Sequence, residues 1–136
     1  MSRGWSGPRR AAVPVLILGL STSMSCAEAD KGPVLPAPAA RGRSIGRTNG
    51  CAACHGTHGE GGVGPAFTGL YGSAVTLADG STVVADEAFL AESIRTPAAS
   101  KVAGYDVDMP SNDLDDDEIA AVIAYIRALA VTDGGS

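Results

Sequence analysis

The sequence predicts a small, mainly α domain that carries one short β-hairpin. Three observations support this. An amphipathic helix pattern occupies residues 115–129, and the segment Cys51-Ala52-Ala53-Cys54-His55 brings two thiols and an imidazole within about one turn of backbone. Only 4% of the 136 residues are aromatic. Because so few aromatic side chains give a thin apolar core, we expect the helices to pack around a non-protein group.

Residues 1–29 predict an export signal. Basic residues precede an apolar run from Ala11 to Leu20, which is too short to span a bilayer stably. Two forms of processing stay open: ordinary cleavage after Ala29, or lipoprotein-type processing with a lipid anchor on Cys26. We therefore expect an exported, periplasmic protein, either soluble or tethered to a membrane. The basic residues are Arg3, Arg9 and Arg10.

Residues 30–40 are rich in proline and alanine, which favours an extended, unpacked linker. This segment is either a tether or simply the start of the mature chain. We place the folded domain at 41–131 and a flexible tail at 132–136.

Within the domain, a first helix is expected from Arg41 to about Asn49, with Gly50 as a left-handed cap. Its only strongly apolar residue is Ile45, so packing must hold it. Further along, Asp79-Gly80 lies between apolar residues and predicts a small β-hairpin. The flanking residues are Val75, Leu77, Val83 and Val84.

A third element is expected from about Asp86 to Arg95, because a helix must stop before Pro97. The last helix has a capping box of Asp115 and Glu118 and a hydrophobic staple of Leu114 with Ile119. Its apolar face follows helical spacing. That face consists of Ile119, Val122, Ile123, Ile126 and Leu129.

The segment from Cys51 to His55 has the C-x-x-C-H spacing of c-type haem attachment. Cys51 and Cys54 can each add to a haem vinyl group, which leaves His55 to ligate the iron. A zinc site needs four ligands, and beyond the motif the chain offers only His58 and Cys26. A thioredoxin-like redox pair would need alternating strands and helices. We therefore expect one covalently attached haem c.

Met109, which precedes Pro110, is the expected sixth ligand of the iron. Ligation by methionine and histidine raises the reduction potential and suits electron transfer. Two alternatives are that Met109 only packs against the haem, or that His58 ligates instead. His58 is too close in sequence to His55 to reach the opposite face easily, so we expect a solvated loop histidine there.

The chain resembles the class I cytochromes c, and specifically the cytochrome c domain fused to bacterial cytochrome c oxidase subunit II. The resemblance spans about Gly42 to Leu129 and implies a small fold whose helices pack around one haem, with a short β-hairpin insertion. It rests on Cys51–His55, Gly59–Pro65, Gly69–Gly72, Val75–Ser81, Lys101–Tyr105 and Met109-Pro110.

The resemblance implies roles for individual residues. The Pro65 carbonyl would accept a hydrogen bond from His55 and orient the ring. Tyr71 and Tyr105 would lie near the haem, and Gly42 would let the first helix cross closely over Tyr125. Two departures stand out: Gly46 replaces a common aromatic, and the sequence shows no membrane helices or copper domain. We expect the cytochrome alone.

Charge limits the partners. Residues 30–136 contain seven basic and fourteen acidic side chains, so nucleic acid is not expected as a partner. Acidic residues gather around Met109 and the start of the last helix. They could steer a basic redox partner, or simply favour the helix N-terminus and water. They are Asp106, Asp108, Asp113, Asp115, Asp116, Asp117 and Glu118.

These observations predict an exported monohaem cytochrome that transfers single electrons in a respiratory chain and is not itself an enzyme. Its partners would be a quinol-oxidising complex or dehydrogenase and a terminal oxidase. It would act as a monomer or as a permanently bound subunit of a periplasmic dehydrogenase or oxidase. Two further classes stay open: a haem enzyme or gas sensor with a labile sixth ligand, and a structural lipoprotein.

Overall fold

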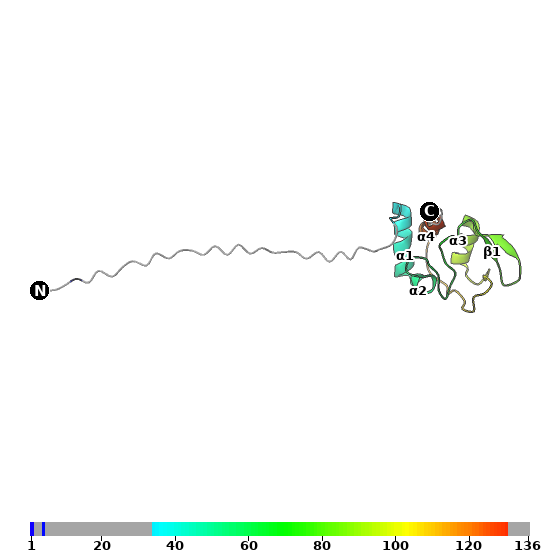
Figure 1. The fold of residues 1–136 in the computed structure, drawn as a ribbon, viewed down its shortest axis with the longest axis horizontal. Coiled ribbons are helices and arrows are strands. Elements are labelled where there is room, and N and C mark those ends of the chain that lie inside the picture. Colours follow the sequence, from blue (N-terminus) through cyan, green and yellow to red (C-terminus); the bar gives the residue numbers. More distant parts are fainter. Residues whose placement is uncertain (2–3, 5–33, 131–136) are drawn as a thin grey trace, which may run out of the picture. The chain divides into compact units, whose positions relative to one another are not determined.

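The computed structural model describes residues 1, 4 and 34–130. The predicted export signal apart from Met1 and Gly4, the linker up to residue 33 and the tail lie outside the described residues. The unit from Lys31 to Ser136 contains all the helices and strands that are described. They follow in the order α1 (Ala37–Thr48), α2 (Ala52–His55), β1 (Ala74–Thr76), β2 (Thr82–Val84), α3 (Glu87–Arg95) and α4 (Asp116–Ala130), as Figure 1 shows.

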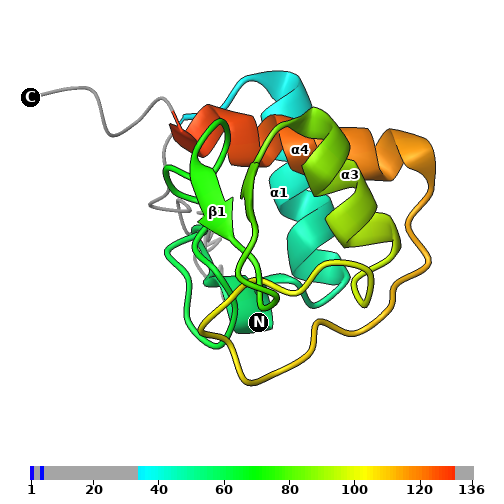
Figure 2. The same ribbon diagram turned by 90° about the vertical axis from the view of Figure 1, so that its right-hand side faces the viewer.

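Helices α1 and α4 cross and form the largest helix contact among the described residues (Figure 2). The crossing is close at Gly42, which is buried. A Cβ atom there would lie only 1.9 Å from the carbonyl oxygen of Ala121. The expected role of Gly42 is therefore confirmed. However, the nearest atoms of α4 belong to Ala121 and Val122, about one turn before the expected Tyr125.

The start of α1 differs from the prediction. The sequence favours an extended linker up to Ala40, but the helix begins at Ala37. Proline is tolerated in a first helical turn because its missing N–H would have no partner there. Pro36 accordingly occupies the N-cap and Pro38 the first turn, while Leu35 packs against the core and Ala39 is buried. Packing against the rest of the domain therefore overrides the composition.

The predicted hairpin is confirmed. Strands β1 and β2 pair antiparallel, with Val75 opposite Val83. At the tip, the Asp79 carboxylate accepts hydrogen bonds from the backbone N–H and the hydroxyl of Ser81. Beyond β1, Leu77 forms an antiparallel bridge with Val102, which ties the hairpin to the chain that follows α3.

Helices α3 and α4 begin where their capping residues predict. The Asp86 carboxylate caps α3 by accepting from the Phe89 N–H at 2.9 Å. Asp115 and Glu118 form the reciprocal capping box of α4, at 2.8 and 3.1 Å. The whole predicted apolar face of α4 is buried. No helix within residues 34–130 is both long and apolar enough to span a membrane.

Candidate haem site

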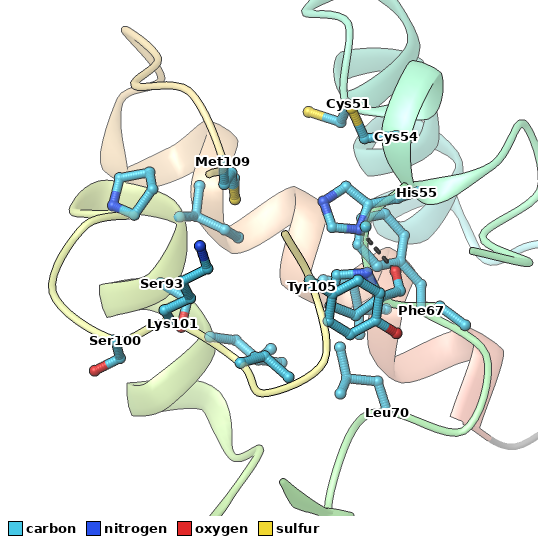
Figure 3. A pocket seen from close by; sticks show the side chains of 18 of the residues that line it. Cys51, Cys54, His55, Phe67, Leu70, Ser93, Ser100, Lys101, Tyr105 and Met109 are labelled. Atoms are coloured by element: carbon cyan, nitrogen blue, oxygen red, sulfur yellow. Dashed lines mark hydrogen bonds between the residues drawn. The ribbon is translucent and has the colours of Figure 1, made fainter. Parts of the chain in front are cut away.

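A cavity of about 710 Å³ lies between the helices and the hairpin. Its wall is mainly apolar and comes from segments far apart in the sequence: α2, the loop after it, β1, α3, the loop before α4, and α4 itself. Figure 3 shows the side chains that point into it. Phe89, Leu90 and Ile94 of α3 line the cavity.

The attachment motif borders this cavity. Gly50, with φ of +80°, ends α1 and lets the chain turn directly into α2. Backbone N–H groups of Cys54 and His55 donate to the Cys51 carbonyl, so the motif forms one tight turn. Among residues 34–130 the two cysteines are not joined in a disulfide, and both line the cavity. Burial raises the pKa of the Cys51 thiol, which keeps it neutral.

The His55 imidazole is held from several sides. Its Nδ1 donates a hydrogen bond to the Pro65 carbonyl at 2.7 Å, since a carbonyl oxygen can only accept. This bond leaves Nε2 with the lone pair that ligates a metal. The Phe67 ring stacks on the imidazole, with the ring centroids 4.5 Å apart. Gly64 lies so close that an added Cβ would be 3.0–3.3 Å from the ring atoms.

Met109 reaches the same cavity from the loop before α4. In Figure 3 its thioether and the His55 imidazole enter the cavity from different sides. Met109 is half-buried. The structure therefore brings an imidazole and a thioether to one mainly apolar cavity that two thiols also line.

The two tyrosines that were expected near the haem differ in their position. Tyr105 lines the cavity, but Tyr71 is not among the lining residues. Instead, the Tyr71 hydroxyl accepts a hydrogen bond from Arg127 at 2.8 Å. The guanidinium carbon of Arg127 also lies 4.5 Å from the centroid of the Tyr71 ring. Tyr71 therefore contacts Arg127 of α4, next to the lining residue Leu70, and does not itself line the cavity.

His58, the alternative ligand, does not line the cavity. It lies in the glycine-rich loop, where its backbone N–H donates to the Glu60 carboxylate at 2.7 Å. The backbone N–H of Glu60 itself contributes most to lowering the pKa of this carboxylate, and the bond from His58 lowers that pKa further. The side chain is half-buried rather than fully solvated as predicted.

Three functional neighbours were not predicted from the sequence: Phe67, Gly64 and Asn112. An aromatic residue two positions after Pro65 is a weak signal for stacking on His55. The tight contact of Gly64 depends on where the imidazole lies. Asn112 lines the cavity and donates to the carbonyl of Ile94, a contact between segments that no local pattern relates.

The residues fit a haem c. The two thiols are free to form thioethers, the imidazole has its metal-binding nitrogen available, and the apolar cavity suits a large apolar macrocycle. A family sequence model for cytochrome c matches residues 39–130, about two thirds of the chain. No curated protein matches the chain. The attachment motif, the histidine oriented by Pro65 and the family match together show that this chain belongs to the cytochrome c family and binds a covalently attached haem c.

Proposed function

We propose that this cytochrome carries single electrons in a respiratory chain, with His55 and Met109 as the two axial ligands of its iron. The observation that supports this most is that both side chains line one cavity, together with the two attachment cysteines. Electron transfer needs coordination that stays the same in both oxidation states. Ligation by histidine and methionine provides that and closes the iron to small molecules.

The chain's own residues hold the group in place. Haem c supplies one iron that changes between the ferrous and ferric states. Cys51 and Cys54 anchor the ring, and the Pro65 carbonyl fixes the orientation and basicity of His55 through the bond to Nδ1. The wall of the cavity is mainly apolar, which suits the macrocycle. Fixed ligands in a packed, apolar site favour a carrier over an enzyme, since a substrate would need an open position on the iron.

The test is the absorption spectrum of the ferric protein made with a haem-attachment system. We expect the weak long-wavelength band of sulfur bound to ferric iron, and slow or absent carbon monoxide binding in the ferrous state. Met109→Ala should abolish the band, lower the reduction potential and allow rapid carbon monoxide binding. A wild type that lacks the band and binds carbon monoxide quickly would instead support a sensor or enzyme.

The partner, in this proposal, is a redox protein with a basic surface. Asp106, Asp108 and Asp113 are exposed on the loop that contains Met109. Several acidic residues nearby already have roles within the protein: Asp115 and Glu118 cap α4, and Asp116 pairs with Arg95 at 2.7 Å. Steering would therefore come from the summed charge rather than from any one carboxylate.

Charged inorganic electron acceptors test this steering. A cationic complex should oxidise the ferrous protein faster at low salt than at high salt, and an anionic complex of similar potential should show the opposite trend. An Asp106→Asn/Asp113→Asn variant should weaken both trends. Rates that are independent of salt would contradict steering.

Export to the periplasm is part of the same proposal. The sequence of residues 1–29 supports it, and mass spectrometry of the native N-terminus distinguishes its two forms. A diacylated Cys26 would mean a membrane-tethered carrier, whereas a chain that begins at Asp30 would mean a soluble one. An uncleaved Met1 in cells that export other cytochromes would contradict export.

A further inference from the structure

Met109 sits on a segment with little backbone support. We call residues 104–111 the methionine loop. Its start is a turn at residues 103–104, but within the described chain residues 106–111 form no backbone–backbone hydrogen bond. Upstream of the loop, two backbone bonds join the chain to the hairpin. The Ala103 N–H donates to the Thr76 carbonyl at 2.9 Å, and the Ala78 N–H donates to the Lys101 carbonyl at 2.8 Å. The position of Met109 must therefore depend on what holds the loop's downstream end.

Asn112 holds that downstream end. Its amide nitrogen donates to the carbonyl of Ile94 at 2.7 Å, and its amide oxygen accepts from the Leu114 N–H at 3.2 Å. Both bonds are partly buried. Ile94 lies in the last turn of α3, where carbonyl groups have no partner within the helix. The Asn112 side chain thus supplies a donor to a carbonyl at the end of α3 and accepts a bond from the segment that leads into α4.

Another side-chain contact joins the loop to its upstream end. Lys101 forms an ion pair with Asp108 at 2.7 Å, but their side chains are 42% and 86% exposed. Exposed ion pairs contribute little, because water and salt screen them. The Asn112 bonds are partly buried, and breaking them would leave the Ile94 carbonyl without a donor, which is costly.

We propose that Asn112 is a positioning residue that keeps the Met109 thioether at the iron by clamping the methionine loop to α3. The inference rests on the proposed function, since it requires Met109 to be the sixth ligand. Asn112 also lines the cavity, so the clamp lies beside the site that it would organise. Loss of the clamp releases the downstream end of a loop whose residues 106–111 form no backbone–backbone hydrogen bond among the described residues. The thioether is then displaced more readily.

The test measures how easily imidazole displaces the thioether in the ferric holoprotein. Asn112→Asp keeps the size of the side chain but cannot donate to Ile94 when ionised, and Asn112→Ala removes both bonds. We expect both variants to bind imidazole about tenfold more tightly than wild type, the factor that corresponds to one partly buried hydrogen bond. Asp108→Asn, which removes the exposed ion pair, should change the affinity by less than about twofold.

A second control separates positioning from general destabilisation. Ile123 is buried but does not line the cavity, so Ile123→Ala lowers the stability of the domain without touching the clamp. If Ile123→Ala tightens imidazole binding as much as Asn112→Asp does, or if both Asn112 variants bind imidazole like wild type, the inference is overturned. A wild type without the sulfur-to-iron band overturns the proposed ligand as well. Unchanged Asn112 variants of a protein that has the band overturn only the clamp.

Discussion

The His55 imidazole has almost no freedom to move. It is bonded to the Pro65 carbonyl, stacked on Phe67 and bordered by Gly64. A donor bond from Nδ1 gives the ligand more negative character, which favours ferric iron and lowers the reduction potential. The neighbours of His55 therefore influence the reduction potential, which a carrier must control. Adding one methyl group at Gly64 should change that potential measurably.

We predict that Gly64→Ala raises the reduction potential of the holoprotein. The added methyl group would lie 3.0 Å from Cε1 and 3.1 Å from Nδ1 of His55, so the ring must shift by a few tenths of an ångström. Because the stacked Phe67 ring also restricts where the imidazole can move, we expect the shift to weaken the bond to Pro65. Potentiometric titration measures the potential, and the NMR shift of the Nδ1 proton reports the bond.

Gly46→Ala is the matched control for this change. An added Cβ at Gly46 would meet only the Cβ of Cys51, at an ordinary 3.8 Å. Its potential should equal that of wild type. If Gly64→Ala also leaves both the potential and the proton shift unchanged, the ring does not depend on this contact.

At the scale of elements, α1 contains two buried glycines with opposite roles. Gly42 permits the crossing with α4, whereas Gly46 faces space that can accept a methyl group. Glycine within a helix costs about 0.5–1 kcal/mol relative to alanine. At Gly42 this cost is offset by the close packing of two helices, but at Gly46 nothing comparable offsets it.

We therefore predict opposite effects of the same substitution. Gly42→Ala should destabilise the holoprotein by about 1–3 kcal/mol or more, because the methyl group would overlap the Ala121 carbonyl. Gly46→Ala should stabilise it by about 0.5–1 kcal/mol. Guanidinium unfolding followed by far-ultraviolet circular dichroism measures both. Equal effects of the two variants would show that the helices do not cross at Gly42.

The hairpin tip gives a prediction about pH. The hydroxyl of Ser81, and then its backbone N–H, hold the pKa of Asp79 below its ordinary value of about 3.9. Because the pKa of Asp79 is depressed in the folded protein, its contacts with Ser81 stabilise the hairpin at pH values above the unfolded pKa. This stabilisation is lost as the pH falls through the folded pKa. In Ser81→Ala, the NMR titration midpoint of Asp79 should rise toward the ordinary value. Asp108 is the control, because Lys101 and not Ser81 lowers its pKa; it should titrate as in wild type in that variant.

On the scale of the whole molecule, the core and the haem cavity share side chains. Phe67, Val75, Leu90, Val122 and Ile126 are buried and also line the cavity. The cavity opens beside the exposed Val63 and Val107, so without haem these apolar side chains would face water. A typical domain is stable by only ~5–15 kcal/mol, so the loss of this apolar burial is a large change.

We predict that the chain without haem does not keep this fold. Protein made without the attachment system should show less helix by far-ultraviolet circular dichroism and no cooperative thermal transition, while the holoprotein should show both. A Cys51→Ala/Cys54→Ala variant made with the attachment system is the control, because it loses the tether under identical growth conditions. A haem-free protein that melts cooperatively with full helix content would contradict this view.

Local interactions are predictable from the sequence, whereas contacts between distant segments are not. The starts of α3 and α4 are predicted correctly from Asp86, Asp115 and Glu118, because capping bonds span only three residues. The hairpin is predicted from Asp79-Gly80, because its turn is equally local. The pairing of Tyr71 with Arg127 joins residues 56 positions apart and is invisible to such patterns. The early start of α1 likewise depends on Leu35 reaching the core.

By itself, the sequence determined the chemistry of this protein: two thiols and an imidazole at fixed spacing define haem c attachment, and local capping and apolar periodicity define α3 and α4. Only the tertiary structure decided what surrounds His55 and Met109. It stacked Phe67 on His55, paired Tyr71 with Arg127 of α4, and joined Asn112 to Ile94 across 18 residues. The physical reason is range: covalent spacing and capping act within a turn of backbone, whereas packing selects among contacts that only the folded chain brings together.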